Sequence, residues 1–324
     1  MRPRTNTGED LTPQMNTDKH GLRVATLLGV RRNASLAPFT TFRVGGPADY
    51  LLEVSRSSDL KDALAAARVD GLPVTILGGG SNVLIADGGV RGLVIRVHGG
   101  EVTAISDDRI RADAGLTING LVRWTINRGV AGLEAWAGTP GTVGGAVHGN
   151  AHFKGRLIGE LIDSVEVVDL AGAATRIAAA DMEFGYDRSR LQRTREIVLS
   201  ADFRVGAGDP AALRAAARAS LAYRKRTQPL EAASAGCIFQ NPDPARDRVP
   251  DGIAPSAGAL VDRAGLKGTA ADGARVSPTH GNFIVNDGAA SAAAIRGLIE
   301  RCRDGVRARF GVELRDEIIY LGFD

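Results

Sequence analysis

The sequence predicts a globular fold of mixed helices and strands, divided into about two domains. The chain has 324 residues, and one ordinary domain takes roughly 100–200 of them. Apolar residues make up 44% and charged residues 24%, which is typical of globular chains and not of disordered or fibrous ones. Short β-rich runs alternate along the chain with segments of helical spacing. We therefore do not expect a single small binding module.

Charge and cysteine content narrow the class of function. Forty Lys and Arg stand against 37 Asp and Glu, and the net charge of +3 is too small and scattered to predict a nucleic-acid surface. The two cysteines, Cys237 and Cys302, cannot build a disulfide framework or a four-ligand zinc site. No run reaches the roughly 18 apolar residues of a membrane span, and no signal peptide opens the chain. We expect a cytoplasmic protein that binds neither nucleic acid nor membrane.

Local patterns predict the elements of the N-terminal part. Residues 1–20 are polar and lack periodicity, so we expect a mobile tail there. A first helix is expected from a cap at Ser58-Asp59 to about residue 69, where Gly71 ends it, and Thr117 caps a second helix. Between residues 93 and 113, β-rich runs alternate with turns. The other expected strands cover residues 50–54, 73–77, 83–85, 164–168 and 196–204.

A domain boundary is expected near residue 206. The stretch from Gly206 to Pro210 is rich in glycine, and Asp209 and Pro210 fit the N-cap and first position of a helix that runs to about residue 226. A long amphipathic helix follows at about residues 290–310, with apolar residues at spacings of three and four. Cys302 lies on its apolar face, which favours a core position. A last strand is expected at residues 318–321.

Glycine is the outlier of the composition, at 41 of 324 residues. The first glycine loop, residues 78–82 (Gly-Gly-Gly-Ser-Asn), follows an expected strand. Backbone N–H groups that glycines leave open can surround phosphate oxygens. The loop is not a Rossmann fingerprint, because the third glycine would fall at Val83 and no helix follows. It is not a P-loop either, because the chain has no Gly-Lys pair.

The second glycine loop, residues 138–146, makes a phosphate ligand more plausible. The two loops bring hydroxyl groups and side-chain amides besides their glycines: Ser81, Thr139, Thr142, Asn82 and Asn150. Two separate loops of this kind favour a ligand with two linked phosphates over a chance pair of glycine-rich turns.

With residues 41–48 (Thr-Phe-Arg-Val-Gly-Gly-Pro-Ala), these loops resemble the FAD-binding segments of the UDP-N-acetylenolpyruvoylglucosamine reductase family. These flavoenzymes complete UDP-N-acetylmuramate for bacterial peptidoglycan. The resemblance covers about residues 36–322 and includes blocks at 234–242, 257–268, 277–286 and 313–322. Residues 226–231 are similar to the shorter of the family's two architectural types.

The resemblance implies an α+β fold. A two-lobed FAD-binding domain of the vanillyl-alcohol-oxidase type would span residues 21–206, with lobes at about 21–97 and 98–206. An α+β substrate-binding domain would span 207–324. The implied ligands are non-covalent FAD, NADPH as co-substrate and a UDP-sugar substrate, bound by a monomer.

The same resemblance assigns binding residues. Those for the cofactor are Arg43, Gly45, Gly78, Gly79, Gly80, Ser81, Asn82, Leu84, Thr139, Pro140, Gly141, Thr142, Gly144, Gly145, Ala146, Asn150 and Ile197. Those for the substrate are Tyr186, Gln228, Asn241, Lys267, His280 and Asn282. His280 can also be interpreted as a residue that orders its loop.

The implied reaction passes hydride from NADPH to the flavin and then to C3 of the enolpyruvyl group. Negative charge develops on C2 and the neighbouring carboxylate, so the site needs a stabilising group and an acid that protonates C2. Where the family usually has a serine as proton donor, this chain has Cys237, and a protonated thiol can take that role. Glu317 matches the family's C-terminal carboxylate, which holds or protonates the intermediate. A buried core cysteine and a surface glutamate are the structural alternatives.

The stabilising cation is the open position. The family commonly has Tyr-Arg-x-Ser, whereas this chain has Asp187 at the arginine position. We expect Arg190 or, slightly less favoured, Arg188 to supply the charge. The alternative is that both are surface arginines and a lysine elsewhere takes the role.

The run from His148 to His152 departs from the family's usual Met-Asn-Ala-Gly, although Asn150 and Ala151 match it. The i,i+4 histidine pair could suggest a metal, but no third ligand stands near it and no step of the reaction needs a metal. We expect no metal, and we interpret both histidines as lining of the flavin pocket.

Two other classes of function fit part of the pattern. Another FAD-dependent oxidoreductase of the same flavin fold, acting on a hydroxy acid or sugar, explains the glycine loops but not the blocks around Cys237, Asn282 and Glu317. A non-catalytic nucleotide-sugar-binding protein would require decayed catalytic positions, and Asp187 is the altered one. A yellow protein that NADPH bleaches would exclude the non-catalytic class.

Overall fold

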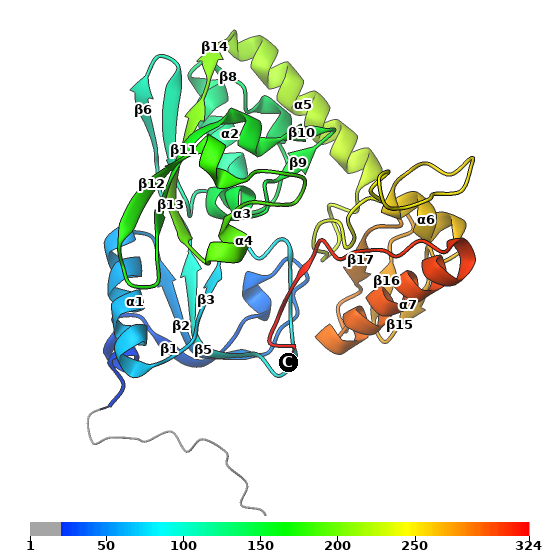
Figure 1. Ribbon diagram of the computed structural model, residues 1–324, viewed down its shortest axis with the longest axis horizontal. Helices are drawn as coiled ribbons and strands as arrows, with labels where there is room; N and C mark the ends of the chain where they lie inside the picture. Colours follow the sequence, from blue (N-terminus) through cyan, green and yellow to red (C-terminus); the bar gives the residue numbers. More distant parts are fainter. Residues whose placement is uncertain (1–20, 324) are drawn as a thin grey trace, which may run out of the picture.

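The computed structural model describes residues 21–323, which form three packed units (Figure 1). The tail predicted over residues 1–20 lies outside the described residues. Helices and strands mix in every unit, as the predicted α+β fold requires. Within residues 21–323, no helix has both the length and the apolar character that a membrane crossing needs.

The first lobe is a four-stranded sheet with a helix on one face. Its strand order is β1 (Arg31–Ser35), β2 (Pro47–Val54), β5 (Val90–Val97) and β3 (Val74–Leu77). Strands β2, β5 and β3 are parallel, and β1 is antiparallel to β2. The buried face of α1 (Ser57–Asp70) packs on this sheet through side chains such as Leu60 and Leu64.

The ends of α1 differ in how well they were predicted. Gly71 ends the helix in the left-handed region, with φ +64°, as expected of a C-terminal glycine. The cap expected at Ser58-Asp59 is wrong, because Arg56 occupies the N-cap position and no side chain caps the helix there. Asp59 instead accepts two hydrogen bonds of 2.9 Å from the Arg56 guanidinium, so that pairing replaces the cap.

The second lobe is a five-stranded antiparallel sheet covered by helices. Its strand order is β12 (Ala174–Ala178), β11 (Ile162–Val168), β13 (Ile197–Arg204), β7 (Arg109–Asp113) and β6 (Val102–Ser106). The helices α2 (Ile118–Asn127), α3 (Val143–His148) and α5 (Pro210–Thr227) contribute to the core on one face. Thr117 caps α2 as predicted, accepting from the Gly120 N–H at 3.0 Å.

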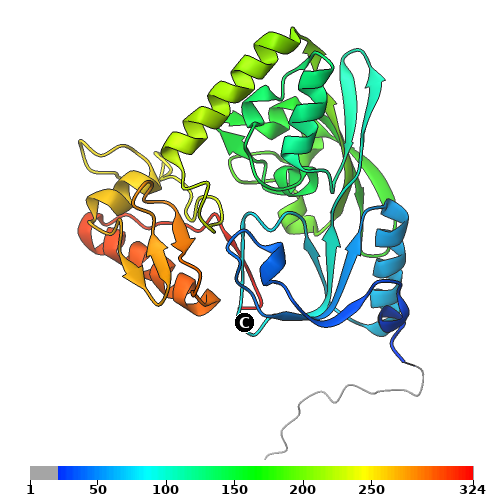
Figure 2. The same cartoon turned by 180° about the vertical axis from the view of Figure 1, so that it is seen from behind.

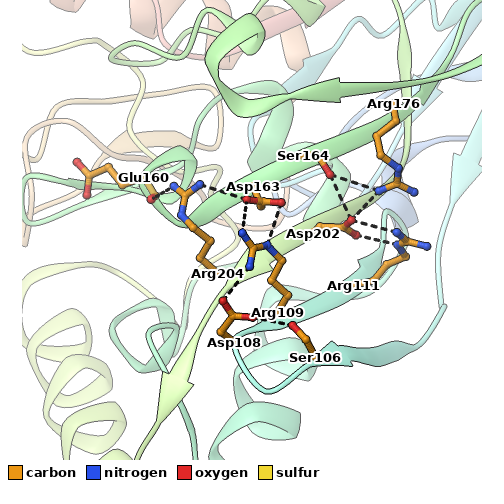
Figure 3. A network of polar contacts seen from close by, with 10 residues as sticks. All are labelled: Ser106, Asp108, Arg109, Arg111, Glu160, Asp163, Ser164, Arg176, Asp202 and Arg204. Atoms are coloured by element: carbon orange, nitrogen blue, oxygen red, sulfur yellow. Dashed lines mark hydrogen bonds and ion pairs between the residues drawn. The ribbon is translucent and has the colours of Figure 1, made fainter.

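The other face of this sheet carries an ionic network (Figure 3). Successive strand residues point to opposite faces, so Ala201 and Phe203 of β13 are buried while Asp202 joins the network. Asp202 accepts from Arg111 at 2.7 Å and from Arg176 at 2.6 Å. The polar side chains of this face are therefore bonded to one another, and the cavity described below opens elsewhere.

The helix α5 begins where it was predicted and packs on the second lobe. Asp209 caps it by accepting from the Ala212 N–H at 2.7 Å, and Pro210 is its first residue. Leu213 and Ala217 belong to the core of the second lobe. The boundary predicted at residue 207 stays a prediction, and this packing favours a position after the helix, near residue 228.

The C-terminal unit packs two helices on a small sheet. It contains α6 (Ala257–Arg263), β15 (Ala270–Ala271), β16 (Ala274–Val276), β17 (Ile284–Asn286) and α7 (Ala292–Phe310). The apolar face of α7 is buried as the spacing predicted, and Cys302 lies in its core with 1% of its surface exposed. The sheet was not predicted, because strands of two or three residues show no periodicity. The short helix α6 was not predicted either.

The chain then returns to the first lobe. Its last strand, β18 (Ile319–Leu321), pairs in parallel with β4 (Val83–Ile85). Figures 1 and 2 both show the red C-terminal segment crossing from the C-terminal unit to the blue and cyan lobe. Because β4 directly follows the first glycine loop, this pairing brings residue Glu317 next to that loop.

Short elements complete the described fold. Two-residue strands are β8 (Val130–Ala131), β9 (His152–Phe153), β10 (Arg156–Leu157) and β14 (Gly206–Ala207), and α4 (Leu191–Thr194) is a single turn. Turns of 3-10 helix lie at Arg23–Thr26, Ala37–Phe39, Glu134–Trp136, Ile158–Leu161 and Ala179–Met182.

Candidate active site

A cavity of about 2050 Å³ is lined by all three units. Its wall includes both glycine loops, strand β3, the end of α5 and the segment 230–237. A volume of this size exceeds the roughly 300–1,000 Å³ of an ordinary small-molecule pocket. The cavity therefore has room for a large cofactor and a second ligand together.

The two glycine loops touch each other in the cavity wall. A Cβ on Gly79 would lie 2.7 Å from the Cα of Gly141, and one on Gly78 would lie 2.5 Å from the Oγ1 of Thr142. Gly141 itself has φ +101°, a conformation that favours glycine. The glycines thus let two backbones approach closely, and both loops line the same part of the cavity wall.

The structure places Cys237 in the cavity wall and braces it from two sides. The N–H of Gly236 donates to the carbonyl of Ser81 at 3.0 Å. Asn282 lies behind the segment: its Oδ1 accepts from the N–H of Phe239 at 2.9 Å, and its Nδ2 donates to the Phe239 carbonyl at 2.7 Å. The residue after the glycine is thereby held against the first glycine loop.

Glu317 is held by the same surroundings. Its backbone N–H donates to the carbonyl of Ile238 at 2.9 Å, and its carbonyl accepts from the Nδ2 of Asn82 at 3.0 Å. Burial raises the pKa of the Glu317 carboxyl. Burial and the nearby carboxylates of Glu317 and Asp187 raise the pKa of the Cys237 thiol. Both groups are therefore set to carry a proton at higher pH than usual.

A histidine with two carboxylates lies in the same wall. The Nε2 of His152 is 3.1 Å from the Oδ1 of Asp187 and 3.7 Å from the Oε1 of Glu317. The imidazole stacks on Tyr186 with ring centroids 4.7 Å apart. Burial lowers the pKa of His152, but the two carboxylates outweigh burial and raise it to about 10.

Comparison with known proteins identifies the family. The profile of the UDP-N-acetylenolpyruvoylglucosamine reductase C-terminal domain matches residues 228–321, and that of an FAD binding domain matches 48–178. A UDP-N-acetylenolpyruvoylglucosamine reductase of Synechococcus sp. (strain WH7803) is 39% identical over 96% of this chain and 99% of its own. The chain belongs to the UDP-N-acetylenolpyruvoylglucosamine reductase family.

Further relatives agree on the family. A UDP-N-acetylenolpyruvoylglucosamine reductase of Caulobacter sp. (strain K31) is 40% identical over 89% of this chain and 93% of its own. The crystal structure of the reductase from Thermus caldophilus has 32% sequence identity and a TM-score of 0.73, and covers 90% of this chain and 98% of that one. The resemblance inferred from the sequence and the α+β fold that it implied are thus confirmed.

Most residues assigned to the cofactor of this reductase family line the cavity, but three do not. Those that line it are Arg43, Gly78, Gly79, Gly80, Ser81, Asn82, Thr139, Pro140, Gly141, Thr142, Gly144, Gly145, Ala146 and Ile197. Gly45 lies in a turn against Ile85, and Leu84 is fully buried in the core of the C-terminal unit. Sequence position alone could not separate these residues from the loops beside them.

Asn150, the third residue that does not line the cavity, has a structural role. It is fully buried; its Nδ2 donates to the carbonyl of Gly185 at 2.7 Å, and its Oδ1 accepts from the N–H of Gly159 at 2.8 Å. Gly185 begins the turn that carries Tyr186 and Asp187. Asn150 therefore fixes that turn to the end of α3 and does not face the cavity.

The structure does not support either arginine as the stabilising cation. The turn from Gly185 to Arg188 places Asp187 at φ +51° and directs Arg188 outward, where its guanidinium lies over Gly185. Arg190 pairs with Glu196, at 3.0 Å from Nε to Oε2. Neither arginine lines the cavity. The local turn, which the sequence pattern did not predict, is the reason.

The sequence analysis did not predict the charge of His152, the carboxylates beside it, or the presence of Arg224 in the cavity wall. His152 does have carboxylates beside it, so the argument that no further ligand-type group stands near it is wrong. Arg224 of α5 lines the cavity, donates to the Oγ1 of Thr139 at 2.8 Å and lies 3.7 Å from the ring centroid of Phe153. Burial lowers the pKa of Arg224 to about 10. A lone arginine in a helical pattern gave no signal of this role.

The residues assigned to the substrate divide in the same way. Tyr186, Gln228, Asn241 and His280 line the cavity, whereas Lys267 and Asn282 do not. Lys267 pairs with Asp262 at 3.3 Å. The Nδ2 of Asn241 donates to the Tyr186 hydroxyl at 3.3 Å, which joins the C-terminal unit to the second lobe. The Nδ1 of His280 accepts from the N–H of Asn282 at 3.2 Å, the geometry of a loop-ordering residue.

Proposed function

We propose that this chain reduces UDP-N-acetylglucosamine enolpyruvate to UDP-N-acetylmuramate, with NADPH as co-substrate and FAD as resident cofactor. The observation that carries the proposal is the meeting of three features in one cavity. The two glycine loops touch, the segment that carries Cys237 is hydrogen-bonded to the first of them through Gly236, and Glu317 is hydrogen-bonded to that same loop through Asn82. Each feature comes from a different part of the chain, and the fold brings them together.

The residues present fit FAD. Any side chain on Gly78 or Gly79 would collide with the second loop, so glycine at these positions lets a pyrophosphate approach the backbone of the cavity wall closely. The Oδ1 of Asn82 is buried and has no hydrogen-bond partner among the described residues, which leaves it free for a ligand. When bound, FAD would supply hydride transfer between NADPH and the substrate.

Cys237 supplies the proton in this proposal. Its thiol stays protonated at neutral pH because burial and two carboxylates raise its pKa. As hydride reaches C3 of the enolpyruvyl group, the electron pair moves toward C2, and the Sγ–H of Cys237 protonates that carbon. Glu317, an ionised carboxylate beside His152 in the resting site, then relays a proton from water to the thiolate, a role that the rise of its pKa on burial favours. Phe239 and Ile238, both buried, close the site from behind.

The alternative classes lack a matching observation. An oxidase of the same flavin fold would not require residues 228–321 to match the reductase C-terminal domain. A non-catalytic nucleotide-sugar-binding protein would not require a proton donor and a carboxylate to be braced side by side. The match to a reductase covers 96% of this chain and not the flavin part alone.

Anaerobic half-reactions test the proposal. The purified yellow protein should lose its flavin absorbance with NADPH and regain it when UDP-N-acetylglucosamine enolpyruvate is added. Mass spectrometry should show one UDP-N-acetylmuramate for each flavin reoxidised. A protein that NADPH bleaches but that only oxygen reoxidises would be an oxidase, and a colourless protein that binds the nucleotide sugar would be the non-catalytic class.

The cellular role follows from the same proposal. A product used for peptidoglycan links the chain to cell-wall synthesis, and through it to cell shape and division. NADPH and nucleotide sugars are cytoplasmic metabolites, so we place the reaction in the cytoplasm. We also propose that the protein is a monomer, and sedimentation velocity of the holoenzyme would reveal a larger assembly.

A further inference from the structure

One cluster of charged side chains has no complete role in the proposed reaction. It consists of His152, Asp187 and Glu317. The three side chains come from β9, from the turn at residues 185–188 and from the C-terminal segment. Their exposed fractions are 22%, 9% and 15%, so water screens the charges only weakly. Asp187 and Glu317 each keep one buried carboxylate oxygen without a hydrogen-bond partner among the described residues, and the Nε2 of His152 is likewise without a hydrogen bond there, although it lies 3.1 Å from Asp187. The cluster thus faces a place that a ligand can occupy.

The imidazole of His152 is the cation of this cluster. The groups that face it are the carboxylates of Asp187 and Glu317 and the ring of Tyr186. Two carboxylates this close repel each other when both are ionised, and a cation between them relieves the repulsion. The raised pKa of His152, about 10, follows from this arrangement. Within the cluster the positive charge is thus present throughout the neutral range.

Arg224 is a second cation of the cavity wall, and its charge acts on the thiol of Cys237. Its guanidinium donates to the Oγ1 of Thr139 at 2.8 Å and lies 3.7 Å from the ring centroid of Phe153, while its buried Nε has no hydrogen-bond partner among the described residues. Those contacts direct it toward the second glycine loop. His152 contacts Glu317 and therefore lies at the end of the cavity where the proton is delivered.

Positions 152 and 187 are also two places where the sequence departs from its family, with histidine for glycine and aspartate for arginine. The structure shows the two departures in contact, at 3.1 Å. An aspartate at 187 cannot stabilise an anion, but it can hold an imidazolium in place. With His152 and Asp187 in place of the family's residues, the site still contains a cation, but the cation comes from position 152 and not from position 187.

We propose that protonated His152, held by Asp187, supplies the positive charge that stabilises the anion formed on the enolpyruvyl group. The inference rests on the proposed function. Hydride forms the new bond at C3, the C2–C3 π bond breaks, and its electron pair moves onto C2 and the adjoining carboxylate. A proton from Cys237 then forms the bond at C2. His152 keeps its own proton throughout and acts electrostatically.

The two half-reactions separate this inference from the proposed function. In the His152→Asn variant, NADPH should reduce the flavin at the parental rate, whereas reoxidation by substrate should slow by about 100-fold or more, the usual effect of removing one stabilising group. His98→Asn is the matched control, because His98 does not line the cavity. Failure of the parental protein to be reoxidised by substrate would remove the proposed function. Parental reoxidation in His152→Asn would remove only the inference.

A relocated charge distinguishes catalysis from a structural role. The single variant Asp187→Arg should be slow, because it sets two cations beside each other. Combining Asp187→Arg with His152→Gly returns the cation to the other segment and should recover most of the reoxidation rate. A structural histidine would not be replaced in this way, so a double variant as slow as His152→Asn alone would overturn the inference.

The protonation state of His152 gives a readout independent of turnover. Nitrogen NMR of the imidazoles should show His152 doubly protonated at pH 8, while His148 and His280, whose pKa values burial lowers, are neutral. In Asp187→Asn the proton of His152 should be lost at lower pH, and reoxidation should slow as pH rises through that value. A neutral His152 at pH 7 in the parental holoenzyme would overturn the inference. So would a stoichiometric divalent metal whose removal by chelator stops reoxidation.

Discussion

Asparagine side chains hold the reacting residues of this site in position. Asn282 satisfies both backbone groups of Phe239, Asn82 binds the carbonyl of Glu317, and Asn150 fixes the turn before Asp187. A primary amide can donate and accept at once, so each of these residues joins segments that are distant in the sequence. The proton donor and its neighbours therefore depend on residues that never touch the reacting atoms.

The role of Cys237 predicts a clear difference between two substitutions. Cys237→Ala should lower turnover by about 100-fold or more, as expected when a general acid is lost. Cys237→Ser should keep substantial turnover, since a hydroxyl occupies nearly the same place. Both variants should still be reduced by NADPH at the parental rate, which stopped-flow absorbance measures. Parental turnover in Cys237→Ala would assign the proton to another group, with Glu317 the first candidate.

The pH dependence of the parental enzyme follows from the same thiol. A free thiol loses its proton near pH 8.5, but burial, Glu317 and Asp187 raise the pKa of Cys237. The protonated form is the donor, so reoxidation by substrate should not decline as pH rises past about 8.5. Alkylation of Cys237 by iodoacetamide at neutral pH should be correspondingly slow, because the thiolate is the reactive form. Fast alkylation at pH 7 would contradict the raised pKa.

Residue types led to the proposed proton donor but not to the proposed cation. Cys237 and Glu317 stand inside continuous blocks, so their roles could be inferred before any contact was known. His152 and Asp187 gave only two separate irregularities in the sequence. Their relation depends on a turn at residues 185–188 with a positive φ at Asp187, and no local pattern predicts which way a side chain leaves such a turn.

At the scale of elements, capped helices were predictable and short glycine-rich ones were not. Thr117, Asp209 and Ser291 each cap a helix by accepting a backbone N–H; the first two had been predicted as caps, and the helix after Ser291 was predicted from its spacing. The helix α3 escaped prediction because glycine disfavours helix and its six residues include two glycines. It forms because its backbone is packed against β13 and Ala114 of the cavity wall.

The contact between the two glycine loops predicts that a side chain on Gly79 prevents FAD binding. Gly79→Val would push against the Cα of Gly141, which is only 2.7 Å from the position of a Cβ, so the loops should separate and purified protein should carry little FAD. Gly297→Ala is the control: that position is exposed in α7 and open to a Cβ. It should keep full FAD and gain about 1 kcal/mol in free energy of unfolding. Absorbance after desalting and urea unfolding measure the two effects.

At the scale of the whole molecule, the returning C-terminal strand closes the active site. The pairing of β18 with β4 ties the C-terminal unit to the first lobe directly after the first glycine loop. The sequence predicted both strands but not their pairing, because a contact between residues 83 and 319 leaves no local signal. The position of Glu317 beside Cys237 is thus a property of the topology, and neither strand contains it alone.

A substitution beyond that strand should test this dependence. Gly322 has φ +74°, and a Cβ there would lie 2.1 Å from the carbonyl oxygen of Gly89, so Gly322→Val should displace β18 from β4. Glu317 would then lose its position, and a positioned acid–base group contributes about 100-fold or more to a rate. Reoxidation of the flavin by substrate should therefore fall at least tenfold. FAD content should fall less, since the glycine loops contact each other independently. Gly311→Asn is the matched control, for Gly311 also has a positive φ but has open space around it, and asparagine tolerates that conformation. If Gly322→Val and Gly311→Asn are reoxidised equally fast, the return strand does not set the position of Glu317.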